Sequence, residues 1–279
     1  MHGTGTLTGV ERDVRRGGMQ VATMMVVLVA LAAVYTIAGV GMDMSALEMT
    51  FGGKLGEAGS MAGMTMDAPG SWGAANATLV FLMWWAMMIA MMLPSTAPTI
   101  LLYTSLLWRL PAETAPWVQA VAFMAGYLLT WAVFSLAATG LQWWFEAANL
   151  VSPSRMAFAE GVAAPLLLVT SGAYQFFPLK DRCLTQCRTP ADFIARHHTP
   201  GILGATQMGV RHGALCLGCC FVLMMLLFVG GIMNLYWIIG LAALVSLEKL
   251  APHGRLIGRA VGAALFGLGI VGLGLVASS

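Results

Sequence analysis

Long uninterrupted runs of apolar residues dominate the chain. Backbone polar groups in hydrocarbon must bond within their own segment, and continuous rather than alternating apolar runs select helices over a barrel. Two of the runs, the fourth at about 161–177 and the sixth at about 233–247, are shorter than the roughly 20 residues of a usual span. The pattern predicts an all-α fold, a polytopic transmembrane helical bundle of about seven spans. These spans cover about residues 19–42, 77–103, 117–140, 161–177, 205–230, 233–247 and 256–277.

Composition supports a membrane protein. Of the 279 residues, 59% are hydrophobic and 9% are charged, whereas a soluble domain carries roughly a quarter charged residues. Membrane lipids are therefore the expected surroundings, and no nucleic-acid partner is expected. Residues 1–18 read as a flexible basic lead, and residues 19–279 as a single transmembrane domain. It includes an external Met-rich loop at about 43–76 and a cytoplasmic loop at about 178–204.

Basic residues alternate between the two sides of the predicted bundle. The odd-numbered connections hold only Lys54 and Arg155. Because cytoplasmic loops are enriched in Lys and Arg, this alternation predicts a multi-pass protein of a bacterial inner membrane, with a cytoplasmic N-terminus and an external C-terminus. The N-terminal lead and the even-numbered connections, which this alternation places on the cytoplasmic side, hold the other basic residues. They are Arg12, Arg15, Arg16, Arg109, Lys180, Arg182, Arg188, Arg196, Lys249, Arg255 and Arg259.

The fifth run carries the most distinctive chemistry. Residues four apart share one face of a helix, and a single stripe there contains Met208, His212, Cys216 and Cys220, with Cys219 at its edge. At a rise of about 1.5 Å per residue, the imidazole lies roughly 10 Å inside the cytoplasmic boundary and the first thiol near the midplane. The alternative is that the cysteines only pack as small hydrophobic residues.

This residue set favours a soft metal ion. Thiolate and thioether ligands select Cu(I), whereas thiolate with imidazole also suits zinc or iron. A thiolate in hydrocarbon is costly unless a cation neutralises it. Adjacent Cys219 and Cys220 diverge by about 100° on a helix, so binding one ion through both requires a local distortion, which Gly218 would permit, or a second ion.

The second run supplies methionines at the same expected depth. Met88 and Met92 share one face, with Met91 on the neighbouring one, and Pro94 is expected to disrupt the helix. We therefore predict a chamber of Met and Cys side chains between the second and fifth spans, with Met88, Met91 and Met92 as candidate ligands. Filling of packing gaps is the alternative role for these methionines.

An intramembrane charge adds to this picture. Arg211 falls within the fifth run, and Glu248 at the end of the sixth is its nearest candidate partner by depth. Alternatively, Arg211 extends its long side chain to the cytoplasmic interface.

The two long connections contain further candidate ligands. Cys183 and Cys187 in the cytoplasmic loop share a face if this stretch is helical, and could hold a metal ion there or be ordinary interfacial residues. The nearby His197 and His198 read as solvated surface. The external methionines weakly favour copper, because thioethers remain ligands under oxidising conditions. They are Met42, Met44, Met49, Met61, Met64 and Met66.

Several of these motifs resemble a functionally uncharacterised bacterial family of predicted metal-binding integral membrane proteins. The resemblance spans about residues 77–250, although Phe221 stands where tryptophan is expected. It implies metal binding and an intramembrane location but no reaction. The matching stretches are Pro178-Leu179-Lys180 with Cys183 and Cys187-Arg188-Thr189-Pro190, Cys216-Leu217-Gly218-Cys219-Cys220 with Leu223-Met224, the Met-rich segment from Met83 to Pro94, and Glu248-Lys249.

Three functions fit these observations. The first is handling of copper as Cu(I), by transport, delivery or assembly, with a metal chaperone or other membrane subunits as partners. The second is a membrane metalloenzyme or electron carrier that acts on an apolar substrate, and the third is a structural subunit of a membrane complex. ATP-driven pumping by this chain alone is not expected, because it has no Walker motif.

Overall fold

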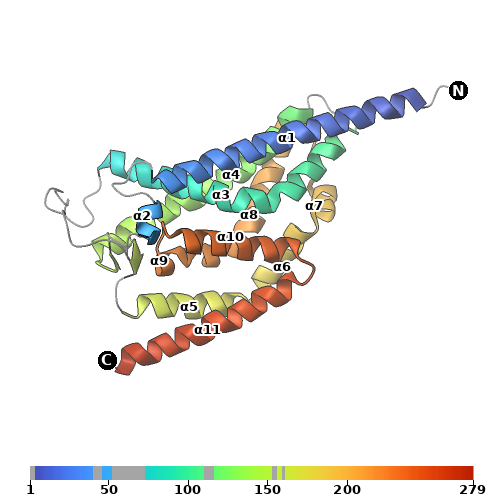
Figure 1. Cartoon of the computed structure of the whole chain (residues 1–279). Helices are drawn as coiled ribbons and strands as arrows, with labels where there is room; N and C mark the ends of the chain where they lie inside the picture. The colour runs from blue at the N-terminus through green and yellow to red at the C-terminus, as the bar shows by residue number, and fades with distance from the viewer. Residues whose placement is uncertain are drawn as a thin grey trace.

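The computed structural model describes residues 4–39, 46–51, 73–109, 116–152, 156–158 and 161–278. It confirms the all-α bundle, and each of the seven predicted spans contains helix (Figure 1). The helices are α1 (Thr4–Ala38), α2 (Ala46–Phe51), α3 (Ala74–Leu107), α4 (Pro116–Ala147), α5 (Ala163–Tyr174), α6 (Pro178–Arg188), α7 (Pro190–His197), α8 (Gly201–Met225), α9 (Leu227–Gly230), α10 (Leu235–Leu250) and α11 (Gly254–Ser278).

Five helical stretches in the described part of the chain are long and apolar enough to cross a membrane. They are Glu11–Ala38, Ala74–Leu107, Pro116–Ala147, Gly201–Gly230 and Gly254–Ser278. The two short predicted spans form α5, of 12 residues, and α10, of 16 residues. At about 1.5 Å per residue these helices are roughly 18 and 24 Å long, less than the roughly 30 Å thickness of a hydrocarbon core. The count of seven is therefore approximate, and the five long helices are compatible with membrane insertion.

Helix α8 packs closely against α4 because small residues line the contact. A Cβ atom at Gly209 would overlap the carbonyl oxygen of Phe123, and one at Gly213 would lie 2.7 Å from Oγ1 of Thr130. Helix α11 likewise packs closely against the end of α5 at a glycine, because a Cβ atom at Gly262 would overlap the side chain of Gln175. Small residues let helices approach closely in lipid. This packing places α8 against α4 along one side.

The polar segments between the long helices also contain regular structure. The described part of the N-terminal lead, predicted to be flexible, is helical, since α1 begins at Thr4. The predicted loop at about 178–204, for which a helical conformation was left open, forms α6 and α7, each with a proline in its first turn, where the missing N–H costs nothing. A two-stranded antiparallel pair follows α4, with β1 (Val151–Ser152) in register with β2 (Ala157–Phe158), Val151 opposite Phe158.

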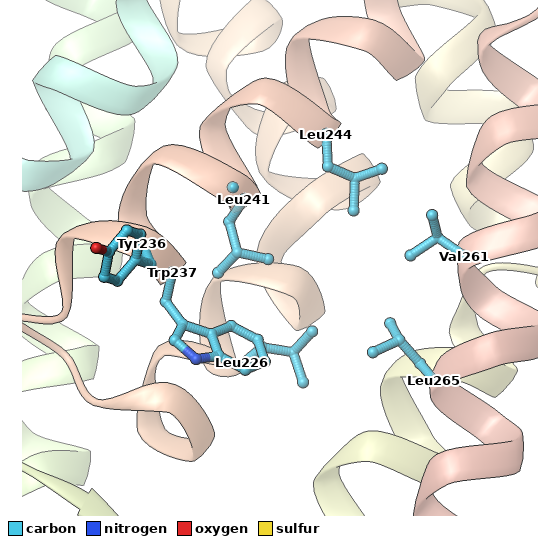
Figure 2. A pocket seen from close by; sticks show the side chains of 8 residues that line it. Leu226, Tyr236, Trp237, Leu241, Leu244, Val261 and Leu265 are labelled. Atoms are coloured by element: carbon cyan, nitrogen blue, oxygen red, sulfur yellow. The ribbon is translucent and has the colours of Figure 1, made fainter.

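An apolar cavity of about 260 Å³ lies between α10 and α11 (Figure 2). Tyr236, Trp237 and Leu241 from α10 face Val261 and Leu265 from α11 across it. None of its lining residues is a cysteine, histidine or methionine. This cavity is therefore separate in chemistry from the predicted metal site.

Candidate metal centre

The predicted stripe of α8 faces the interior of the bundle. Met208, Cys216 and Cys220 are fully buried, and His212 and Cys219 are almost so. The four-residue spacing places Met208, His212, Cys216 and Cys220 on one face of α8, which runs unbroken from Gly201 to Met225, and Cys219 lies at the edge of that face. The sequence therefore placed these side chains on the correct face.

Cys220 of α8 contacts Met92 of α3. Their sulfur atoms lie 3.9 Å apart, and both side chains are fully buried. The thiols of Cys219 and Cys220 donate to the carbonyl oxygen of Cys216 at 3.1 and 2.9 Å. The contact between Cys220 and Met92 joins the two spans from which we predicted a Met and Cys chamber.

The methionines of α3 are all buried, and the helix continues through both of its prolines. Met83, Met87, Met88 and Met91 lie in the core together with Met92. The expected disruption at Pro94 does not end the helix. Its effect is local: the carbonyl oxygen of Met92 accepts hydrogen bonds from the hydroxyls of Ser95 at 2.8 Å and Tyr127 at 3.2 Å.

A lysine lies against the thiol of Cys216. The Nζ atom of Lys249, from α10, donates to Sγ of Cys216 at 2.9 Å and to Oγ of Ser95 at 2.9 Å. The hydroxyl of Tyr127 lies 3.1 Å from the same sulfur. The charge pattern of the sequence predicts only an interfacial role for Lys249 and gives no indication of Tyr127 or Ser95. The position of Lys249 directly after an apolar run, beside Glu248, is the signal that could have revealed it.

His212 occupies an aromatic environment rather than a thiol environment. Its Nε2 atom lies 3.4 Å from Oγ1 of Thr96, and its buried Nδ1 atom has no hydrogen-bond partner. The rings of Phe123, Tyr127 and Phe193 surround it, with centroids 4.9 to 6.0 Å away.

The cysteines of α6 lie over the same part of α8. Both are buried on one face, as expected for a helix. A Cβ atom at Gly218 would lie 2.8 Å from Sγ of Cys183, so this glycine makes room for the thiol. A hydrogen bond with Cys219, together with burial, raises the pKa of Cys187 well above its usual value, and burial raises the pKa of Cys183.

The two loop histidines are not fully solvated. His197 and His198 are half-buried. The ring of His197 stacks on Phe193 with a centroid distance of 4.9 Å, and that of His198 lies 6.2 Å from Tyr103. The interpretation of these residues as ordinary solvated surface was therefore wrong.

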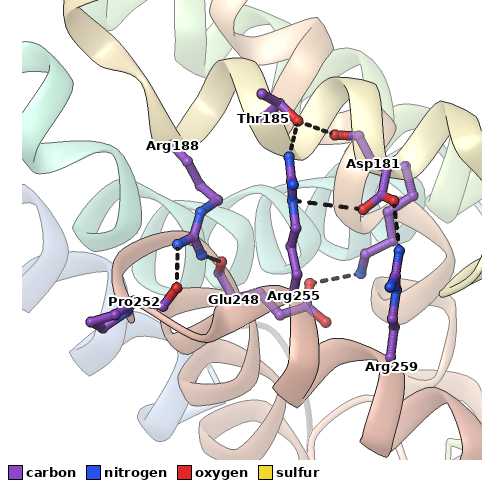
Figure 3. A network of polar contacts seen from close by, with 8 residues as sticks. Asp181, Thr185, Arg188, Glu248, Pro252, Arg255 and Arg259 are labelled. Atoms are coloured by element: carbon purple, nitrogen blue, oxygen red, sulfur yellow. Dashed lines mark hydrogen bonds and ion pairs between the residues drawn. The ribbon is translucent and has the colours of Figure 1, made fainter.

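A network of charges fastens α6 to α10 and α11 (Figure 3). Lys180 and Glu248 form a buried ion pair at 2.6 Å, and Arg188 donates to the carbonyl oxygen of Glu248 at 2.6 Å. Asp181 pairs with Arg259 at 3.1 Å on the exposed side. The partner predicted for Glu248 is thus corrected, because its carboxylate binds Lys180. Arg211 has an exposed side chain.

The sequence from residue 81 to residue 272 matches the family PpoB2, whose description is copper chaperone. This match covers more than half of the chain. The chain belongs to this copper chaperone family. No curated protein and no solved structure gave a match.

Membership in a copper chaperone family points to copper as the metal. The matched segment begins within α3 and ends within α11, so it contains every cysteine of the chain and the methionines of α3. The methionines from Met42 to Met66, which the sequence predicted to be external, lie before the match. Met42, Met44, Met61, Met64 and Met66 also lie outside the described residues, as does the side chain of Met49.

The buried cysteines of α8 and methionines of α3 suit copper better than a metal that needs three or four hard or borderline ligands. Within the ranges that the structure describes, no three His, Cys, Asp or Glu side chains are grouped so that they could hold one ion. Structural zinc in proteins usually takes four such ligands. Cu(I) accepts thiolate together with thioether, and the contact between Cys220 and Met92 offers that combination.

Proposed function

We propose that this chain is a membrane-embedded copper chaperone that holds Cu(I) between Cys216, Cys220 and Met92. The observation that carries the proposal is the 3.9 Å separation of Cys220 Sγ and Met92 Sδ in a fully buried position. With metal–sulfur bonds of about 2.3 Å, two sulfurs at this distance subtend an angle of roughly 116° at one ion. Cys216, one helical turn before Cys220, provides the second thiolate.

Two thiols of α8 form only weak hydrogen bonds, both within their own helix. The thiols of Cys219 and Cys220 donate to the backbone carbonyl oxygen of Cys216. Such bonds from a weak donor are modest in strength, so rotation of a side chain toward an ion exchanges a weak bond for a metal–thiolate bond. In the proposed site, the Cys220 thiol is therefore held only weakly before it binds an ion.

The thiols of α6 supply a second position at the end of this site. Cys187 contacts Cys219 through a hydrogen bond, and Cys219 is adjacent to Cys220 in the chain. In our proposal, Cu(I) is received at Cys183 and Cys187 and passes by ligand exchange through Cys219 to the inner sulfurs. Met88 and Met91 continue the same buried surface of α3, and His212 serves as a neighbouring polar group.

The direction of transfer follows from the proposed orientation. Figure 1 shows the N-terminal end of α1 at the same end of the bundle as α6, α7 and the start of α11, and the C-terminus at the opposite end. These regions carry the basic residues that favour the cytoplasmic side. We therefore place α6 at the cytoplasmic face of an inner membrane, where a soluble copper carrier or another membrane subunit can reach it.

Metal analysis of the purified full-length protein tests this function. The wild-type protein, loaded with Cu(I) under reducing conditions and desalted, is compared with Cys216→Ala, Cys219→Ala, Cys220→Ala and Met92→Leu. We expect copper to fall to background in the Cys216→Ala/Cys220→Ala double variant. Met124→Leu is the matched control, because Met124 is a buried methionine of α4 outside the proposed site. Unchanged copper content in all of the cysteine variants would refute the proposal.

A further inference from the structure

A positively charged side chain lies inside the sulfur cluster and is not one of its proposed ligands. The side chain of Lys249 is 5% exposed, and its Nζ atom donates to Cys216 and Ser95. A buried ammonium group is costly unless an anion compensates it. The adjacent carboxylate of Glu248 is bound to Lys180. The sulfur of Cys216, as a thiolate, is therefore the group in contact with Lys249 that can balance its charge.

The net charge of the loaded site then depends on the ion. One ammonium and the two thiolates of Cys216 and Cys220 sum to a single negative charge. A monovalent ion makes the site neutral, whereas a divalent ion leaves one positive charge buried among apolar side chains, where it is penalised. A third anionic ligand does not remove this charge, since the described residues contain no group of three His, Cys, Asp or Glu able to hold one ion.

We infer that Lys249 acts as a fixed positive charge that makes the sulfur site select a monovalent soft cation over divalent soft cations. This inference rests on the proposed copper site and adds the residue that determines its specificity. Softness of the sulfur ligands excludes hard ions such as magnesium, but it does not distinguish Cu(I) or Ag(I) from Cd(II). The charge of Lys249 supplies that second criterion.

The expected effect is large enough to measure. Two unit charges about 5 Å apart in a protein environment with an effective dielectric constant of about 20 interact strongly enough to change an equilibrium constant roughly 100-fold. A divalent ion experiences this repulsion twice and a monovalent ion once. Removal of the charge should therefore shift the preference between the two by roughly 100-fold.

A purely structural role for Lys249 predicts a different result. If the lysine only fastens α10 to α3 and α8, its loss weakens the binding of all ions alike. A selectivity ratio separates the two roles, because a general loss of structure cancels in it. The ratio should also return when the charge is restored by another side chain.

The experiment compares Ag(I) and Cd(II), which are both thiophilic and resistant to air oxidation, on the detergent-solubilised full-length protein. The dissociation constant of each is measured by competition with a chelator, for wild type, Lys249→Met and Lys249→Arg. We expect Lys249→Met to lower the preference for Ag(I) over Cd(II) roughly 100-fold and Lys249→Arg to retain it. A second pair of variants leaves Lys249 in place: Ser95→Asp compensates its charge and should shift the ratio in the same direction, whereas Ser95→Asn should not.

The outcomes separate this inference from the function on which it rests. If wild type binds Ag(I) with the same affinity as Cys216→Ala/Cys220→Ala, the proposed site itself is wrong. If wild type binds Ag(I) through these cysteines but the ratio is equal in wild type, Lys249→Met and Ser95→Asp, the role of Lys249 in selectivity is refuted. If Lys249→Met does not fold, the comparison of Ser95→Asp with Ser95→Asn decides the question.

Discussion

The sulfur atoms of Cys220 and Met92 lie 3.9 Å apart, although 128 positions separate the two residues in the chain. One comes from α8 and the other from α3, and both are fully buried. The contact brings a thiol and a thioether together in the buried interior of a protein that belongs to a copper chaperone family. It is the structural basis of the proposed Cu(I) site.

Met92→Leu should weaken Cu(I) binding by about tenfold or more. Altering a residue that only positions a metal ligand already lowers the affinity by about this factor, so loss of a ligand itself should lower it at least as much. Leucine preserves volume and burial but removes the sulfur, so the thermal midpoint should change little. Competition with a Cu(I) chelator measures the affinity. An equal loss in the control Met124→Leu would show that the effect is general packing rather than ligation.

Gly218→Ala should displace the side chain of Cys183, which packs against this glycine. The added Cβ would lie 2.8 Å from the Sγ atom of that cysteine, which is too close without movement. We expect destabilisation of about 1–3 kcal/mol, typical of overpacking, and faster modification of Cys183 by a maleimide, detected by mass spectrometry. Gly140→Ala is the matched control, since a Cβ there meets nothing within 4 Å. Equal labelling rates in the two variants would contradict the account.

Loss of the buried ion pair should loosen α6. Glu248→Gln leaves Lys180 buried without its 2.6 Å partner, and removal of one member of such a pair costs about 3–5 kcal/mol. Thermal unfolding in detergent should register this loss, together with faster alkylation of Cys187. Arg259→Gln provides the contrast, because its pair with Asp181 is about half exposed and should contribute only about 0–1 kcal/mol. The prediction is wrong if both variants are equally stable.

Much of the site could be predicted from the sequence because it depends on spacing within single helices. The stripe of α8 follows from residues four apart, and the methionines of α3 were placed at a matching depth. The seat of Cys183 over Gly218 and the insertion of Lys249 against Cys216 could not be predicted, because they depend on how α6 and α10 pack against α8. Depth alone predicts an ion pair between Glu248 and Arg211, but the packing of α6 against α10 pairs Glu248 with Lys180 instead.

The thiols of α6 should react only at elevated pH in the copper-free protein. The pKa of Cys187 is raised chiefly by its hydrogen bond with Cys219, and that of Cys183 by burial. Both groups therefore favour the protonated form in the folded state. Their contribution to stability is complete below the pKa of an unfolded cysteine, about 8.5, and is lost as pH rises through the folded values.

The rate of iodoacetamide modification against pH measures this directly. Its midpoint for Cys183 and Cys187 should lie above that of a free cysteine peptide, and thermal stability should decline over the same alkaline range. Midpoints at or below that of the peptide would contradict the proposed environment of α6.

X-ray absorption at the copper edge of the Cu(I)-loaded full-length protein tests the central claim most directly. We expect a copper ion surrounded by two or three sulfur atoms at about 2.3 Å, with one sulfur fewer in Met92→Leu and no bound copper in Cys216→Ala/Cys220→Ala. A first shell of nitrogen or oxygen atoms, or a spectrum unchanged in these variants, would contradict it.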